Sequence, residues 1–397
     1  MKKILFLVLL CFFLTSHFAN AQQGIRFHGF VKNSIYSYQT EKTHTRAYQY
    51  VQLNLATPGN NVILSTSMRA LSDANEPLTS DQRFKAYTFH LQIKNLLWNR
   101  LNMTVGRQFL HPGTILGGLD GAIGNLKILK NLSLMFYAGT ESNFQRAFKI
   151  YETKDSFVSG GLLQMNRLFS TRLQLLYLQK KNDQGIFWQI AGLNVDNALV
   201  PKTRLRLQAH YDMQNQRMHR LLVSARNTWS TKFMTTLEYK IQYPQVYAMS
   251  FFTIFQPTAY RQIRANAAFQ FVKGYFINAQ YQLVQFEEDD ANRVFLTIQS
   301  RNGSIGAIYE SGYAGDQLGL MFDYALEILP NLMASVYVDY SKYRTEQIYE
   351  YDNQLSNAAR LSYRFNSHWS MDVEYQWLTN RYKEKDARFL NHISCRW

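Results

Sequence analysis

Apolar and polar residues alternate along most of the chain from residue 25 to residue 397. In residues 204–211, for example, Leu205, Leu207 and Tyr211 alternate with charged or amide side chains. A period of two is the pattern of a β-strand, whose successive side chains point to opposite faces. The same period recurs in residues 233–241, 263–271, 275–283 and 371–377. No stretch shows a long helical period, so the sequence predicts an all-β fold.

Two kinds of connection separate the expected strands. Short links are expected near residues 57–60, 96–99, 129–131, 167–170, 228–231, 272–274, 300–304, 327–331 and 366–368. Longer, polar links are expected at residues 71–83, 108–120, 140–155, 287–290, 342–355 and 379–387. The two kinds alternate if residues 242–258 form one further long loop. Transmembrane β-barrels show this alternation and an even strand number, and the count here is about 22 strands, within a range of 18–22.

The N-terminus has the pattern of a secretory signal peptide. Two lysines, at positions 2 and 3, precede an apolar run over residues 4–14, and Ala-Asn-Ala at 19–21 supplies a cleavage site. The run is too short for a membrane-spanning helix, which needs about 20 apolar residues. Lipidation at Cys11 is disfavoured because a leucine precedes it. We therefore expect a signal peptide at residues 1–21 and one β-barrel domain at residues 22–397.

Composition narrows the class of the exported chain. Cys395 is the only cysteine after residue 21, so no intrachain disulfide can staple the fold. Aromatic residues make up 15% of the chain, yet mean hydropathy is only −0.29. A large soluble β-protein and an outer-membrane β-barrel both fit these values. The number of expected strands favours the barrel, placed in the cell outer membrane in contact with lipid and lipopolysaccharide.

The alternating pattern runs to the last residue of the chain. Phe389, Asn391, Ile393, Cys395 and Trp397 share one face of the final expected strand. A closed barrel explains this, because its last strand must pair with its first. A terminal aromatic residue resembles the C-terminal signature of outer-membrane barrel proteins, which implies recognition by the barrel-assembly machinery. The usual residue there is phenylalanine, and Trp397 is a variant of it.

A second resemblance lies in VGRQFLHPGTILGGLDG, residues 105–121. A strand ending in Gly106-Arg107-Gln108, followed by a glycine-rich loop that closes with Asp120-Gly121, resembles the alginate-export-like and related porin-type barrels. The resemblance implies that this segment folds toward the lumen and forms a constriction with Arg107, His111 and Asp120. It implies no substrate. The alternative is an ordinary external loop whose glycines allow a compact turn.

Charged residues of the expected strands fall on the polar face, which would line the lumen. Removal of the signal peptide leaves a net charge of (43 − 2) − 28 = +13. Pairing residues across the expected turns places Arg220 opposite both His210 and Lys240, and Arg226 opposite Arg204. Like charges that face each other are destabilising unless water or an anion screens them. We therefore predict an anion track formed by Arg204, Arg206, His210, Arg220, Arg226, Lys240 and Arg264.

Acidic residues are expected on another part of the wall. Arg360 would face Glu374, with Asp372 one step further along. Arginine and lysine tracks favour anions, and opposing acids would set up a field across the lumen. The alternative interpretation is that any water-filled lumen is polar, and that these pairs only brace the wall. The acidic run at 287–290 lacks the spaced ligands of a calcium loop and fits a solvated loop.

No enzymatic motif accompanies this pattern. The sequence lacks HExxH, CxxC, GxSxG and phosphate-binding loops, and its histidines are scattered. We expect no enzyme, cofactor, metal site or nucleic-acid partner. The expected function is passive diffusion of small hydrophilic, anionic solutes through an outer-membrane channel, with homo-oligomerisation left open. Two alternatives are a barrel that assists export or surface assembly of an anionic polysaccharide, and a surface scaffold barrel with an occluded lumen.

Overall fold

A computed structural model describes residues 24–40, 42–111, 113, 117–143, 149–198, 200–243, 259–287, 289–313, 315–346 and 349–397, except for the side chains of residues 167 and 384. The signal peptide expected at residues 1–21 lies outside these residues, so its boundary stays a prediction. Most of the expected loop at 242–258 also lies outside them.

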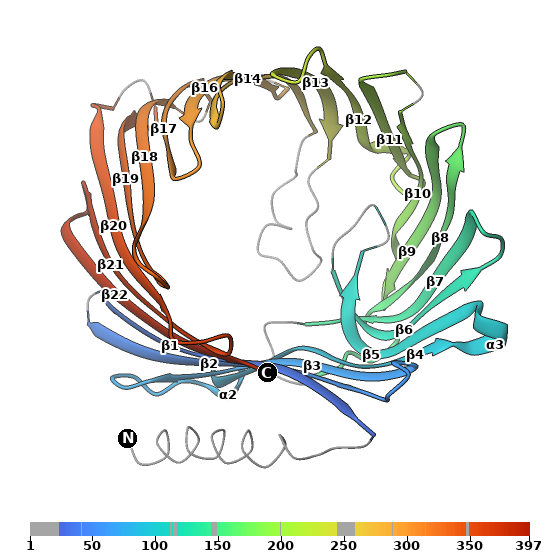
Figure 1. Ribbon diagram of the computed structural model, residues 1–397. Helices are drawn as coiled ribbons and strands as arrows, with labels where there is room; N and C mark the ends of the chain where they lie inside the picture. Colours follow the sequence, from blue (N-terminus) through green and yellow to red (C-terminus); the bar gives the residue numbers. More distant parts are fainter. Residues whose placement is uncertain are drawn as a thin grey trace.

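Within the described ranges, 22 antiparallel strands form one closed sheet (Figure 1). Each strand pairs with its neighbours in sequence, and the last strand pairs with the first. The predicted all-β barrel and its count of about 22 strands are therefore confirmed. The strands are β1 (Arg26–Gln39), β2 (Thr43–Ala56), β3 (Val62–Asp73), β4 (Phe84–Asn95), β5 (Leu101–Leu110), β6 (Gly117–Lys127), β7 (Leu132–Glu141), β8 (Phe157–Leu168), β9 (Thr171–Asn182), β10 (Gly185–Asn197), β11 (Thr203–Asp212), β12 (Arg217–Thr228), β13 (Phe233–Gln242), β14 (Tyr260–Val272), β15 (Tyr275–Gln285), β16 (Asp290–Gln299), β17 (Gly303–Gly312), β18 (Asp316–Leu329), β19 (Leu332–Arg344), β20 (Asp352–Arg364), β21 (Trp369–Asn380) and β22 (Lys383–Arg396).

The alternation along each strand separates two surfaces. On β18, Leu318, Leu320 and Phe322 are 55%, 56% and 41% exposed on the outer surface. Met321 and Asp323 alternate with these residues and share a face with the inner residues of β17 and β19. Exposed apolar side chains recur at outward positions around the barrel. Such a continuous apolar surface fits a lipid environment and not water.

Helical structure is confined to short connections. Among the described residues, the helices are α2 (Ser80–Arg83) and α3 (Leu96–Asn99), each of four residues. Neither is long and apolar enough to cross a membrane.

The short links expected from the sequence all occur at the end of the barrel that carries the C-terminus. At the opposite end, the prediction of a long loop at 379–387 is wrong. β21 reaches Asn380 and β22 begins at Lys383, because Asn380 Oδ1 accepts hydrogen bonds from the backbone NH groups of Tyr382 and Lys383, both at 3.0 Å. This side chain closes a tight turn.

Other expected loops are shorter than predicted. β19 continues to Arg344 and β20 begins at Asp352, so the loop expected at 342–355 is cut from both sides. Likewise β5 continues to Leu110 and β6 begins at Gly117, within the loop expected at 108–120. Cross-strand pairing therefore carries the period-two pattern further than the polar composition of these segments suggests.

The closing seam is fixed by the last residue of the chain. Backbone hydrogen bonds join Trp397 and Gly29 in both directions, each at 3.1 Å. The Trp397 ring stacks on Phe27 with centroids 5.6 Å apart, and it covers Gly29 so closely that a Cβ there would lie 2.3 Å from a ring carbon. The expected pairing of the last strand with the first is confirmed. The role of Trp397 as an assembly signal stays a prediction.

At the end of the barrel opposite the C-terminus, the ends of β5 and β6 leave the wall. β4 pairs with β5 only between Phe89–Ile93 and Met103–Arg107. Gly106 makes the departure, with a φ of +123° and no room for a Cβ beside the Phe89 carbonyl. Figure 1 shows the end of β5 inside the ring of strands. There the two strand ends complete an apolar cluster with the inner face of β7–β10: Leu110, Leu119, Ile123, Tyr137, Val158, Leu162, Leu176, Leu178 and Ile190.

Candidate functional site: the barrel lumen

Charged side chains on the inner face of the barrel are accessible to water. The side chains of Arg204, Arg206 and Arg360 are 56%, 50% and 48% exposed. All three share the inner parity of their strands, since their strand neighbours carry the outward apolar side chains. Water therefore reaches the inner surface on two parts of the wall.

One part of this wall, β11–β14, is strongly basic. Its strand register places seven arginines and lysines and two carboxylates at inner positions, a net charge of 7 − 2 = +5 with histidine neutral. We call this surface the basic wall: Arg204, Arg206, Arg217, Arg220, Arg226, Lys240 and Arg264, with Asp212 and Glu238. It contains every member of the predicted anion track except His210.

Several of these cations have carboxylate partners that the sequence did not reveal. Arg204 donates two hydrogen bonds of 2.7 Å to Asp196 on β10, and Arg206 lies 3.6 Å from the same carboxylate. Arg264 donates to Glu238 at 2.9 Å. The inner parity of Asp196 and Glu238 was a usable signal, but the pairings needed the registers of β10 with β11 and of β13 with β14.

Three cations of the basic wall have no carboxylate within 4.0 Å among the described residues: Arg220, Arg226 and Lys240. The Lys240 ammonium lies 4.9 Å from the centre of the Tyr260 ring. Arg226 Nε lies 2.7 Å from the Met234 sulfur. These side chains therefore keep their positive charge uncompensated by a direct ion pair.

The predicted pairings across turns were mostly right. His210 faces Arg220 and Arg204 faces Arg226, as predicted. The pairing of Lys240 with Arg220 was wrong by two residues, because Thr228 pairs with Met234 and the turn is centred one residue later. His210 is fully buried, 2.8 Å from Asn194 Oδ1, and is not part of the exposed surface.

A second part of the wall, β18–β21, is acidic. Its inner positions carry two arginines and six carboxylates, a net charge of 2 − 6 = −4. We call this surface the acidic wall: Asp323, Glu327, Asp339, Asp352, Asp372 and Glu374, with Arg360 and Arg364. Arg360 faces Glu374 as predicted, with Nε 2.7 Å from Oε2. The two walls lie on different sides of the ring, separated by β15–β17 (Figure 1).

The segment expected to form a constriction contains a buried ion pair. Arg107 donates to both oxygens of Asp120, at 2.7 and 2.8 Å, and to the carbonyls of Ala86 and Lys149, at 3.2 and 3.0 Å. The two side chains are 5% and 4% exposed, so they brace the inward-bent strand ends and do not face open solvent. His111 is exposed and lines an inner hollow with Asn125 and Gln164.

We predict that Asp120→Asn destabilises the barrel by about 3–5 kcal/mol, because it leaves the buried Arg107 charge without its partner. The measurement is the denaturant midpoint of the purified barrel in detergent. Arg381→Gln is the matched control, since Arg381 and Asp352 form an exposed pair at 3.3 Å whose loss costs less than about 1 kcal/mol. Equal effects of the two substitutions would contradict the bracing role of Asp120.

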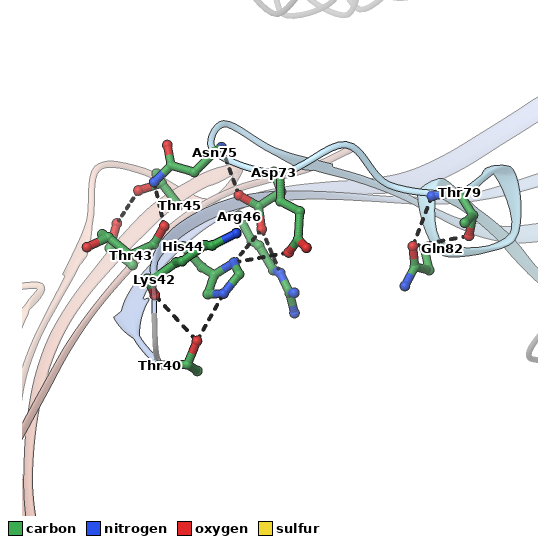
Figure 2. A network of polar contacts seen from close by, with 12 residues as sticks. Thr40, Lys42, Thr43, His44, Thr45, Arg46, Asp73, Asn75, Thr79 and Gln82 are labelled. Carbon is green, nitrogen blue, oxygen red and sulfur yellow. Dashed lines mark hydrogen bonds and ion pairs between the residues drawn. The ribbon is translucent and has the colours of Figure 1, made fainter. Parts of the chain in front are cut away.

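A polar cluster lies at inner positions where β2 begins and β3 ends, at the end of the barrel opposite the C-terminus. Figure 2 shows its contacts. The Asn75 backbone NH donates to Asp73 Oδ1 at 3.0 Å, and Arg46 Nε donates to Asp73 Oδ2 at 3.1 Å. His44 Nδ1 lies 3.0 Å from the same Oδ2. Burial alone would raise the pKa of Asp73, but these hydrogen bonds, led by that from Asn75, lower it to about 2.

This cluster lies beyond the apolar band. Ser37, Thr45 and Ser72 occupy the neighbouring outward positions, where other parts of the barrel expose leucine or phenylalanine. The Ser37 and Thr45 hydroxyls lie 3.2 Å apart. The Asp73 carboxylate is therefore held ionised at a polar rim.

Comparison with known proteins supports the fold. No family model matches the sequence, and a search of curated proteins finds no match. Solved structures with a similar fold include the translocation pore of the P pilus usher PapC, at 9% identity and a TM-score of 0.51, covering 94% of this chain and 99% of that one. A BenF-like porin from Pseudomonas fluorescens Pf-5 is 8% identical, with a TM-score of 0.46 and coverages of 94% and 98%. OccK2 of Pseudomonas aeruginosa, solved with glucuronate, is 7% identical, with a TM-score of 0.42 and coverages of 94% and 97%.

At these identities the likeness concerns the fold alone. The chain has the fold of an outer-membrane β-barrel. The resemblance of residues 105–121 to alginate-export-like barrels gains no support from a family match.

Proposed function

We propose that this chain is an outer-membrane channel through which small hydrophilic solutes, preferentially anions, diffuse passively. The basic wall is the observation that carries the proposal. It has a net charge of +5 and includes three cations without a carboxylate partner within 4.0 Å among the described residues. Arginine and lysine side chains that line a pore favour the passage of anions.

The mechanism needs no covalent step and no cofactor. The outward apolar band seats the barrel in lipid, and the inner polar face holds water. A dissolved anion is drawn toward the basic wall and repelled by the acidic wall. The ion pairs of Arg204 and Arg264 hold these side chains against the wall, where their remaining donors face the water. The inward-bent ends of β5 and β6 occupy part of the lumen.

Simple electrostatics gives the size of the effect. An unpaired cation about 5 Å from a passing anion contributes about 1 kcal/mol in a medium as polar as water. One such contribution raises the local concentration of the anion about fivefold at room temperature. Three such cations therefore suffice for a marked preference, and salt weakens it.

The other roles considered from the sequence predict different behaviour. A barrel that assists polysaccharide export would require a partner, and an occluded scaffold would pass no solute. For this chain we propose lipopolysaccharide, membrane lipid and the barrel-assembly machinery as partners, and small anions as the transported class. No catalytic role is proposed.

Uptake into liposomes tests the proposal. Glucuronate and glucose are matched probes, because they share a ring and differ in one carboxylate. We expect the purified barrel to admit both, with faster entry of glucuronate at low salt and a smaller difference at high salt. Equal rates, or faster entry of glucose, would overturn the anion preference. Entry of neither solute into liposomes with folded barrel would overturn the passive channel.

A further inference from the structure

Three potential metal ligands converge at the polar rim. His44 is on β2, Asp73 ends β3, and Glu76 follows in the next connection. His44 Nδ1 lies 3.0 Å from Asp73 Oδ2 and 3.7 Å from Glu76 Oε2. These ligand atoms all lie within 4.8 Å of one another. Each residue thus offers one atom to a common point.

The second ring nitrogen of His44 has a hydrogen-bond partner that orients the ring (Figure 2). His44 Nε2 lies 3.1 Å from Thr40 Oγ1, and the Thr40 hydroxyl donates to the Lys42 carbonyl at 3.4 Å. Thr40 Oγ1 is thus placed to accept a proton from Nε2 when Nδ1 binds a metal ion. A neutral imidazole with its proton on Nε2 presents a bare lone pair at Nδ1. Metal-ligating histidines are commonly held through their other nitrogen in this way.

Nδ1 of His44 thus faces the carboxylates of Asp73 and Glu76. A divalent ion bound at Nδ1 would take the place of a proton between Nδ1 and Asp73 Oδ2, which lie 3.0 Å apart. Arg46 touches Asp73 Oδ2 from its own side, at 3.1 Å, and fixes the carboxylate. Two carboxylates and one guanidinium leave a local charge of −2 + 1 = −1, which favours a further cation.

We propose that His44, Asp73 and Glu76 bind a divalent transition-metal ion of the zinc class. One imidazole nitrogen and two carboxylate oxygens suit Zn²⁺, with water as the fourth ligand of a tetrahedron. Magnesium and calcium take six or more oxygen ligands and fit this set poorly. The side chains of His44 and Asp73 are 11% and 0% exposed, whereas that of Glu76 is 49% exposed, so an ion can enter from the Glu76 side.

The bound ion would join the connection after β3 to the rim. Two ligands belong to strands, and Glu76 belongs to the segment that follows. The site is independent of the proposed channel function, because it needs only the folded barrel. This site was not predictable from the sequence, since His44 and Asp73 are 29 residues apart and form no metal-binding motif.

Calorimetric titration of the untagged, full-length barrel in detergent with ZnCl₂ tests the proposal. We expect one saturable Zn²⁺ site per chain, at least tenfold weaker in Glu76→Gln and lost in His44→Gln. Substitution of Zn²⁺ by Co²⁺ should give the visible absorption of a tetrahedral centre. Glu350→Gln, at an exposed acid of another connection, is the matched control and should bind like the unaltered chain.

Several results would overturn the proposal. One is the absence of saturable Zn²⁺ binding to folded barrel, which would leave the His44–Asp73 contact as a hydrogen bond within the rim. Another is binding that the Glu76→Gln and His44→Gln substitutions leave unchanged. A third is binding of Mg²⁺ or Ca²⁺ as tight as that of Zn²⁺, which would indicate general counter-ion attraction. Because Glu76 is half exposed, its variant tests the site even if His44→Gln fails to fold.

Discussion

Replacing Arg220, Arg226 and Lys240 together by glutamine is expected to abolish most of the preference for glucuronate over glucose. These side chains lack a carboxylate partner within 4.0 Å among the described residues, so each substitution removes an uncompensated positive charge. The net charge of the basic wall would fall from +5 to 5 − 3 = +2. We expect the ratio of the two liposome uptake rates to drop by roughly threefold or more.

A matched triple variant separates this effect from a loss of net charge. Lys232, Lys273 and Arg301 are exposed cations in the turns at the end that carries the C-terminus. Their replacement by glutamine removes the same charge from outside the basic wall and should change the ratio little. If both triple variants reduce the ratio equally, the basic wall does not determine selectivity.

The substitution Gly29→Val is expected to prevent closure of the barrel. A side chain at this position would meet the Trp397 ring, since even a Cβ would lie 2.3 Å from a ring carbon. The contact joins the first and last strands, so its loss exposes two unpaired strand edges. We expect little folded protein in the membrane, measured by the heat-dependent shift in electrophoretic mobility that folded barrels show.

Changes at Trp397 test the same seam from its other side. Deletion of Trp397 should impair assembly, because it removes both backbone hydrogen bonds to Gly29 and the stacking on Phe27. Trp397→Phe keeps an aromatic ring and should assemble. Gly117→Ala, where no atom lies within 4 Å of an added Cβ, is the control for glycine replacement. Normal assembly of both Gly29→Val and the truncated chain would refute the role of the seam.

The architecture was predictable because strand periodicity is a local property. Alternation at residues 204–211 or 371–377 requires no knowledge of neighbouring strands. Tight links such as 366–368 then determine which residues face each other, and so Arg360 was correctly paired with Glu374. The centre of a turn is harder to predict from the sequence. A displacement by one residue at 229–232 moved the partner of Arg220 by two positions, from Lys240 to Gln242.

Features that depend on distant segments could not be predicted. Gly106 was visible in the sequence, but the inward bend of β5 depends on where its pairing with β4 ends. The partnership of Asp196 with Arg204 needed the register between β10 and β11. A long run of polar residues suggested a loop at 379–387, where the Asn380 side chain instead closes a tight turn.

The reversal potential of the purified barrel in a planar lipid bilayer tests the central proposal most directly. A KCl gradient across the bilayer separates the permeabilities of potassium and chloride. The basic wall predicts a steady conductance with a reversal potential displaced toward that of chloride, and a smaller displacement at higher salt. A potential at zero or displaced toward that of potassium would contradict the anion preference, and no conductance from folded barrel would contradict the channel.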